Sequence, residues 1–148
     1  MRLVFSDLDG SLLDHYSYSY AAALPQVKAL ERAGIPLILV SSKTRAEILS
    51  LRDELANRHP FIVENGAAVF IPQQYFEEQP ADTVDRDGYW IYEMAPPRTQ
   101  WLTVLKELEG EFPGCFDTFH RAGVAGIMAM TGLSQEQATA ANQREYSE

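Results

Sequence analysis

The sequence predicts an α/β fold built on a parallel sheet, and two observations lead to this prediction. Apolar runs with few polar interruptions occur at residues 3–5, 35–40 and 60–63, as is typical of strands that are covered on both faces. Two segments with apolar residues at helical spacing separate these runs. The order strand, helix, strand, helix, strand indicates a doubly wound sheet with right-handed crossovers.

Both expected helices carry signals at their ends. Pro25 suits the first turn of the first helix, and Gly34 followed by Pro36 ends it. Thr44 and Glu47 have the spacing of a capping box at the start of the second helix. The apolar residues at helical spacing are Leu24, Val27 and Leu30 in the first helix and Ile48, Leu51 and Leu55 in the second.

The pattern changes after the third strand. Asn65-Gly66 lies between two apolar runs and predicts a tight turn, and the sequence becomes polar and acidic towards residue 80. The elements expected beyond it are an aromatic strand at 89–94, an amphipathic helix at 96–112 and a further helix with Ser134 and Gln137 as its capping pair. We therefore assign 1–80 to the first part of a core domain and 81–148 to part of a second, α+β domain. We expect the chain to be incomplete, because three strands make a thin sheet for this architecture.

Composition limits the possible partners. Lys and Arg number 12 against 21 Asp and Glu, a formal net charge of −9, which argues against a nucleic acid or an anionic membrane as partner. The single cysteine, Cys115, permits no internal disulfide and fits a reducing compartment. Asp7 and Asp9 interrupt what would be the apolar region of a signal peptide, so we expect a cytoplasmic protein. The sequence leaves the oligomeric state open.

Two aspartates follow the first strand with one residue between them. Ligands of open α/β sheets bind at the carboxyl ends of the strands, where Asp7 and Asp9 are expected to lie. Like charges this close repel each other, and Mg²⁺, which prefers oxygen ligands, would relieve that repulsion. A carboxylate can also act as a covalent nucleophile, and a second carboxylate can transfer protons. The alternative is a polar exit from a strand, since Asp and Gly10 both favour turns.

A candidate anion site follows the second strand. Ser41, Ser42 and Lys43 stand just before the helix that begins near Thr44. Hydroxyl groups, exposed backbone N–H groups and a lysine at a helix N-terminus favour binding of an anion. The alternative is ordinary capping by Thr44 with a solvated lysine. One strand away from the aspartates, this loop would hold a phosphoryl group against Asp7.

Three segments resemble the haloacid dehalogenase superfamily of phosphatases. "VFSDLDGSLLD" resembles its first motif, "LILVSSKTR" its second, and "FIVENGA" the third strand and turn of the subclass with a large α/β cap. Within that subclass, "SSKT", "ENGA" and the closing "TGLSQEQATAANQREYSE" are most similar to the mannosyl-3-phosphoglycerate phosphatases. The resemblance implies a Rossmann-like three-layer core with a parallel sheet, together with part of an inserted α+β cap.

The resemblance also implies a mechanism. Asp7 would attack phosphorus and form an aspartyl-phosphate, while Asp9 would protonate the leaving oxygen and later deprotonate water. Mg²⁺ would be held by the Asp7 carboxylate and the main-chain carbonyl of Asp9. The Ser41 hydroxyl and the Ser42 N–H would bind the phosphate, with Lys43 in the same loop.

The resemblance also implies which residues contact the substrate and which motifs of the superfamily the 148 residues lack. Asn65 and Gly66 would lie at the mouth of the site, and Arg144 would clamp a glycerate carboxylate or a phosphate. The superfamily's third-motif lysine and fourth-motif acidic pair have no counterpart among the 148 residues, and Lys43 is not that lysine by position. The expected substrate is mannosyl-3-phosphoglycerate. The alternatives are another sugar-phosphate phosphatase, a phosphomutase, and a catalytically incomplete fragment.

Overall fold

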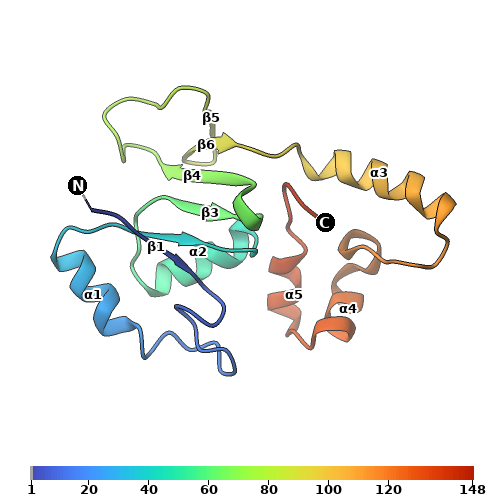
Figure 1. The fold of residues 1–148 in the computed structure, drawn as a ribbon, viewed down its shortest axis with the longest axis horizontal. Coiled ribbons are helices and arrows are strands. Elements are labelled where there is room, and N and C mark those ends of the chain that lie inside the picture. The colour runs from blue at the N-terminus through green and yellow to red at the C-terminus, as the bar shows by residue number, and fades with distance from the viewer. Residues whose placement is uncertain (1) are drawn as a thin grey trace.

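The computed structural model describes residues 2–148 as an α/β protein (Figure 1). One sheet of six strands runs through it in the order β1-β2-β3-β4-β6-β5. The strands are β1 (Val4–Asp7), β2 (Leu37–Val40), β3 (Phe61–Val63), β4 (Ala68–Pro72), β5 (Val84–Arg86) and β6 (Tyr89–Glu93). The helices are α1 (Leu24–Arg32), α2 (Arg45–Glu54), α3 (Arg98–Glu111), α4 (Phe119–Thr131) and α5 (Gln135–Ala141), with a 3-10 turn, η1 (Glu64–Gly66).

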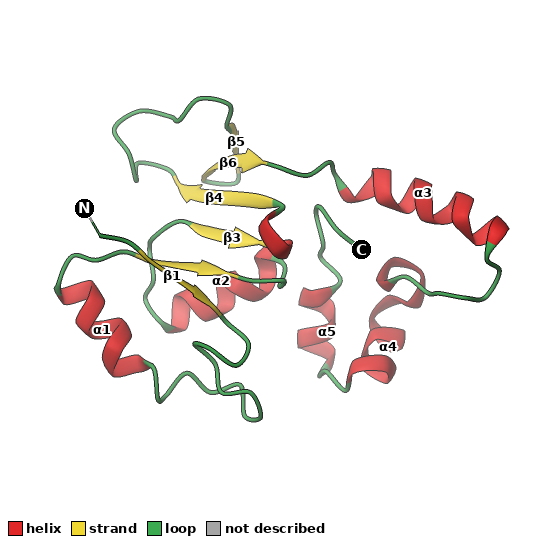
Figure 2. Cartoon of the chain, viewed as in Figure 1, coloured by secondary structure: helices red, strands yellow, loops and turns green. Residues whose placement is uncertain are grey.

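The first half of the chain has the predicted alternation. β1, β2 and β3 are parallel neighbours, with α1 and α2 as the crossovers between them, which confirms the predicted α/β class. Pro25 stands in the first turn of α1. Thr44 caps α2 through the predicted capping box with Glu47. Figure 2 shows the long loop that joins β1 to α1.

One face of the sheet carries the hydrophobic core. Leu39, Phe61 and Phe70 are register neighbours on adjacent strands, and all three are fully buried. Val27 of α1 and Ile48 of α2 belong to the same cluster, so both helices cover this face. The Phe61 and Phe70 rings are stacked with centroids 5.2 Å apart, an arrangement that contributes about 0.5–1.5 kcal/mol beyond burial of area.

The sheet is wider than the three strands expected from the sequence. After η1 the chain turns back, and β4 pairs antiparallel with β3. β6 then pairs with β4, and β5 with β6. The expected three-stranded sheet was wrong because the apolar run after the predicted turn forms β4, and the strand predicted at 89–94 joins this sheet as β6. β5 was not expected, because Val84–Arg86 lies in a polar segment that reads as a linker, whereas it forms an exposed edge strand. The boundary at residue 80 stays a prediction, although β5 and β6 beyond it join the same sheet through β4.

The C-terminal helices lie beside the carboxyl ends of the parallel strands. α5 packs against both α2 and α4, whereas α3 extends away from the sheet (Figure 1). α5 begins with the predicted capping pair, Ser134 and Gln137. α4 was not expected from the sequence because Gly123 and Gly126 weaken its helical pattern, and Gly123 indeed leaves the helical conformation with φ 62°. None of the helices described is long and apolar enough to cross a bilayer.

β1 lies at one edge of the sheet and exposes large apolar side chains. Its hydrogen-bonded partner in the sheet is β2. Phe5 of β1 is 60% exposed, and Leu3, which directly precedes the strand, is 43% exposed. Phe5 points to the face opposite the core, because its register partner is Ile38 whereas the core residue Leu39 pairs with Ser6. An open apolar edge of this kind favours pairing with another chain.

We predict that this edge makes the 148-residue chain self-associate and bind a hydrophobic dye. The variant Phe5→Lys should lower both the dye fluorescence and the mass found by analytical ultracentrifugation, since a charged edge residue disfavours edge pairing. Tyr16→Lys is the matched control, because Tyr16 is 90% exposed in a loop outside the sheet. A wild-type chain that stays monomeric and binds no dye would refute the prediction.

Candidate functional site

The carboxyl ends of β1 and β2 bring the two predicted motifs together. Asp7, the last residue of β1, is the register partner of Val40, the last residue of β2. Asp7 and Asp9 are both exposed, while Leu8 between them is fully buried. The buried leucine anchors the loop, and the carboxylates on either side of it face solvent. They lie at the carboxyl ends of the strands, where ligands of open α/β sheets bind.

Backbone hydrogen bonds hold the loop after β1 in a tight turn. The Leu13 N–H donates to the Leu8 carbonyl over 2.8 Å, and the Gly10 N–H donates to the Leu13 carbonyl over 3.0 Å. Gly10 has φ 75°, a conformation that a side chain would strain. The loop therefore has a defined shape that fixes Asp9 close to Asp7.

Lys43 connects the aspartate loop to the loop after β2. Its Nζ atom lies 3.1 Å from Asp9 Oδ1, with the two side chains 23% and 39% exposed. The ammonium group also lies 5.7 Å from the centre of the Tyr18 ring. The structure thus brings Lys43 to the aspartates, where the sequence analysis expected only a common anion site.

Ser41 and Thr44 have different roles in the loop before α2. Ser41 is 3% exposed, and its Oγ accepts a hydrogen bond from the Lys43 N–H over 3.2 Å. Thr44 caps the helix and its Oγ1 also donates to the Ala140 carbonyl of α5 over 2.9 Å. Ser42 is exposed. Capping by Thr44 is therefore present, and it leaves the Ser41–Lys43 segment in front of the helix N-terminus.

The turn after β3 lies against the same loop. Glu64, Asn65 and Gly66 have φ angles of 49°, 60° and 92°, so three successive residues are left-handed. The Glu64 N–H donates to the Lys43 carbonyl over 3.1 Å, and the Asn65 N–H donates to the Ser41 carbonyl over 3.0 Å. The predicted turn residues Asn65 and Gly66 are therefore brought to the Ser41–Lys43 segment.

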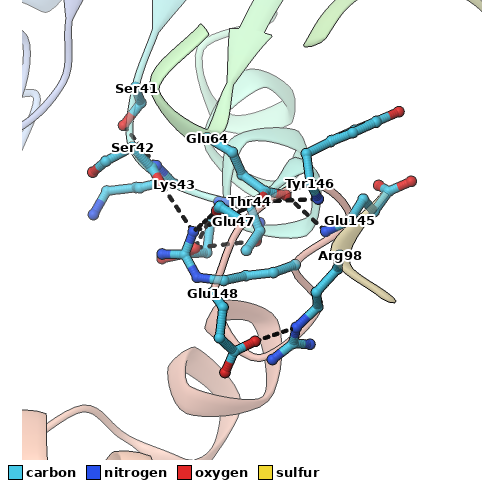
Figure 3. A network of polar contacts seen from close by, with 12 residues as sticks. Ser41, Ser42, Lys43, Thr44, Glu47, Glu64, Arg98, Glu145, Tyr146 and Glu148 are labelled. Atoms are coloured by element: carbon cyan, nitrogen blue, oxygen red, sulfur yellow. Dashed lines mark hydrogen bonds and ion pairs between the residues drawn. The ribbon is translucent and has the colours of Figure 1, made fainter. Parts of the chain in front are cut away.

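Glu64 is a polar residue of this region that was not expected from the sequence. Its side chain is wholly buried. Both carboxylate oxygens accept hydrogen bonds from the closing segment of the chain, residues 144–147. Oε1 accepts from the Glu145 N–H over 2.8 Å, and Oε2 accepts from the Tyr146 N–H over 3.1 Å and the Ser147 hydroxyl over 2.6 Å. Figure 3 shows Glu64 between the loop and this segment. The signal in the sequence was a carboxylate directly after a buried strand.

Arg144 lies next to Glu64 and to the loop. Its Nη1 is 3.8 Å from Glu64 Oε2 and 3.5 Å from the Ser42 carbonyl oxygen, and it donates to Ser147 Oγ over 2.8 Å. The guanidinium also lies 5.7 Å from the centre of the Phe119 ring. The structure therefore brings Arg144 to the Ser41–Lys43 segment, although the two are about a hundred residues apart in sequence.

A second set of polar contacts holds Tyr146. Its hydroxyl donates to Glu93 over 2.7 Å and accepts from Arg86 over 2.9 Å. Burial raises the pKa of this phenol well above its ordinary value, so the hydroxyl remains a donor. Arg45 Nε lies 2.8 Å from Glu145. These contacts join the closing segment to β5, β6 and α2.

A cavity lies beside the turn that carries Asn65. It has a volume of about 610 Å³ and is lined by Asn65, Gly66, Met94, Trp101 and Ser147, among others. Trp101 is 41% exposed and Met94 66% exposed. This cavity is large enough for a sugar-sized group.

The donor atoms near β1 fit a hard divalent cation in type. The Asp7 carboxylate and the Asp9 carbonyl are oxygen ligands, which Mg²⁺ prefers. Within residues 2–148 there is no group of three His, Cys, Asp or Glu side chains placed to hold a metal ion. Further ligands would therefore have to be water, phosphate oxygens or groups outside the described residues.

The sequence itself identifies the family. Residues 4–87 match the haloacid dehalogenase-like hydrolase family, and this chain belongs to that family. It is 39% identical over 147 residues to a glucosyl-3-phosphoglycerate/mannosyl-3-phosphoglycerate phosphatase of Methanococcoides burtonii, covering 99% of this chain and 54% of the relative. It is 37% identical over 149 residues to a mannosyl-3-phosphoglycerate phosphatase of Pyrococcus furiosus, covering 100% of this chain and 59% of the relative. The chain thus spans about half the length of the curated relatives it matches.

Solved structures agree on the fold. A hypothetical protein from Geobacillus kaustophilus superimposes with a TM-score of 0.58 at 17% identity, over 98% of this chain and 55% of that one. A haloacid dehalogenase-like hydrolase from B. subtilis gives a TM-score of 0.53 at 21% identity, over 75% of this chain and 34% of that one. At these identities the likeness establishes the fold alone.

The carboxyl groups of Glu145 and Glu148 have pKa values shifted in opposite directions. Burial raises the pKa of Glu145, against the nearby Arg45 and Arg86. Burial also opposes the charge of Glu148, but hydrogen bonds from Arg98, over 2.5 Å, and from the His120 N–H, over 2.9 Å, outweigh it and lower the pKa. Glu145 therefore costs stability as the pH rises from its ordinary to its raised pKa, and Glu148 loses its stabilising effect as the pH falls through its lowered pKa.

We predict that Glu145→Gln and Glu148→Gln change the pH dependence of unfolding in opposite senses. In the wild-type chain, Glu145 makes the free energy of unfolding fall as the pH rises above the ordinary carboxyl pKa, and Glu145→Gln should remove this fall. Glu148 makes the free energy of unfolding fall as the pH drops below the ordinary carboxyl pKa, and Glu148→Gln should remove that fall. Urea unfolding between about pH 3 and about pH 7 measures both effects. If both variants altered the profile in the same sense, the described contacts of one of these groups would be wrong.

Proposed function

We propose that this chain forms the nucleophile-bearing part of a phosphatase that hydrolyses a glycosyl-3-phosphoglycerate to the glycosylglycerate and phosphate. The observation that carries the proposal is the register of Asp7 with Val40, which sets the aspartate loop beside the Ser41–Lys43 segment. The relatives named as glucosyl-3-phosphoglycerate or mannosyl-3-phosphoglycerate phosphatases support the substrate class.

Asp7 is the proposed nucleophile. Its exposed carboxylate attacks the phosphorus in line, the bond from phosphorus to the glycerate oxygen breaks, and an aspartyl-phosphate forms on Asp7. The Ser41 hydroxyl and the Ser42 N–H bind the phosphoryl oxygens at the N-terminus of α2, where the helix dipole favours an anion. Water then attacks the aspartyl-phosphate and releases inorganic phosphate.

Asp9 is the proposed acid and base. It protonates the departing glycerate oxygen and then removes a proton from the attacking water. Lys43 holds the Asp9 carboxylate at 3.1 Å, so Asp9 has to exchange this contact before it can reach the leaving group. A phosphoryl group on the loop offers Lys43 another negative partner. Substrate binding would therefore free Asp9 for proton transfer.

Mg²⁺ is the proposed cofactor. The Asp7 carboxylate and the Asp9 carbonyl would hold it, with the remaining ligands from water, phosphate and groups outside residues 2–148. When bound, Mg²⁺ would neutralise negative charge on the phosphoryl oxygens. Asp7 and Asp9 themselves still supply the nucleophile and the proton transfers.

The glycosylglycerate part of the substrate is proposed to lie over η1. Asn65 and Gly66 stand between the Ser41–Lys43 segment and the cavity of about 610 Å³, so a group attached to the bound phosphate would reach that cavity. Arg144 is within 3.5 Å of the Ser42 carbonyl oxygen. Its guanidinium would bind a phosphate or glycerate oxygen by charge-assisted hydrogen bonds.

Phosphate release from mannosyl-3-phosphoglycerate and glucosyl-3-phosphoglycerate tests the proposal. The assay compares this chain with a form extended to the length of its relatives, with Mg²⁺ and after chelation. In the extended form, chelation should abolish turnover, and Asp7→Asn should lower kcat by about 10³-fold or more. Asp9→Asn should lower it by about 10²–10⁴-fold.

Asp53→Asn is the matched control for these substitutions. Asp53 lies near the end of α2 and pairs with Arg58, and the Asp53 side chain is 75% exposed. Loss of the Asp53 charge should leave kcat unchanged. An extended form that keeps its activity without Asp7 would exclude Asp7 as nucleophile. Activity on unrelated sugar phosphates with none on the two glycosylglycerate esters would exclude the substrate class.

A further inference from the structure

Glu64 contacts two segments that meet at the proposed phosphate site. Its backbone N–H, with that of Asn65, binds the carbonyls of Lys43 and Ser41. Its carboxylate accepts the three hydrogen bonds from residues 145–147. One residue thus joins the loop after β2 to the closing segment of the chain.

The burial of Glu64 makes these two sets of contacts depend on each other. The side chain is 0% exposed, and a buried carboxylate is tolerated only while donors satisfy it. Its backbone and that of Asn65 are left-handed, at φ 49° and 60°, a conformation that persists only when the surroundings hold it. Undocking residues 145–147 would leave the carboxylate unsatisfied and would release the turn that supports the loop.

Docking of the closing segment also brings a positive charge to the loop. Arg144 precedes the three donor residues, and its Nη1 lies 3.8 Å from Glu64 Oε2 and 3.5 Å from the Ser42 carbonyl oxygen. The chain carries a net charge of −9, so an anion on the loop needs cations close by. Lys43 is one such cation, and the docked segment supplies a second.

We propose that Glu64 is a positioning residue that couples anion binding on the Ser41–Lys43 segment to docking of residues 144–147. The inference rests on the proposed function, because it takes this segment as the phosphate site. An anion there stabilises the docked segment through Arg144 and through the turn at Glu64. By thermodynamic linkage, the docked segment strengthens anion binding by the same factor.

Hydrogen exchange of the wild-type chain tests the coupling without any substitution. The Glu145 and Tyr146 amides donate to Glu64, so their exchange reports on docking. Saturating inorganic phosphate should slow their exchange by about 5-fold or more, the lower range of typical coupling. The reference amides are those of Ile91 and Val69, which belong to the paired strands β6 and β4 and to neither of the two coupled segments, and they should be unaffected.

Glu64→Gln tests the residue itself, with Glu93→Gln as the matched control. Glu93 holds the same closing segment through the Tyr146 hydroxyl at 2.7 Å, and the structure gives it no hydrogen bond to the Ser41–Lys43 segment among the described residues. Glu64→Gln should weaken phosphate binding by about 5-fold or more and remove the effect of phosphate on the two amides. Glu93→Gln should retain wild-type phosphate affinity and the phosphate effect.

The outcomes separate this inference from the proposed function. If the wild-type chain binds phosphate but the two amides exchange at unchanged rates, the coupling is wrong and the phosphate site stands. If the wild-type chain binds no phosphate, the proposed site fails and the coupling fails with it. Equal losses in Glu64→Gln and Glu93→Gln would show general undocking and would overturn the role of Glu64. If Glu64→Gln does not fold, the wild-type exchange measurement decides alone.

Discussion

The buried carboxylate of Glu64 is the interaction on which the arrangement of the site depends. It takes three hydrogen bonds from residues 145–147, while the backbone of the same turn binds the loop after β2. Each of these contacts joins parts of the chain that are distant in sequence. Because an unsatisfied buried carboxylate is costly, the loop after β2 and the closing segment form one structural unit around this side chain.

Electrostatics explain how an acidic chain can present an anion site. The net charge is −9, but Lys43, Arg45 and Arg144 all lie around the start of α2, each paired with or close to a carboxylate. The helix N-terminus adds further positive potential. These side chains and the N–H groups at the start of α2 are the groups that could contact an anion at the end of β2, next to the aspartates that follow β1.

The parts of the fold that rest on local signals could be predicted from the sequence. The strand and helix alternation, the Thr44–Glu47 capping box and the Ser134–Gln137 capping pair are all present. Among the elements that were not predicted, β5 and α4 have weak local signals: β5 is a short, exposed and polar strand, and α4 is interrupted by Gly123. β5 forms by pairing with β6, and α4 packs against α5. In both cases contacts with another element decide the structure, and local propensity does not.

The same distinction holds at the candidate site. Asp7 lies next to the Ser41–Lys43 segment because β1 and β2 are parallel neighbours. The alternation of elements in the sequence already implied this arrangement. The partners of Glu64 could not be predicted, because a carboxylate at the end of a strand gives no local sign that residues some eighty positions later will cover it. Long-range hydrogen bonds of this kind depend on the packing of α5 against α2 and α4, which brings the closing segment back to the sheet.

A double-mutant cycle between Glu64→Gln and Ser147→Ala tests the central interaction most directly. The Ser147 hydroxyl lies 2.6 Å from Glu64 Oε2, and a hydrogen bond to a charged group contributes about 1.5–3 kcal/mol. The free energies of unfolding of the two single variants and the double variant, measured in urea, should give a coupling energy of about 1 kcal/mol or more. Effects that add to within about 0.3 kcal/mol would contradict the account, because Glu64 would then not hold the closing segment.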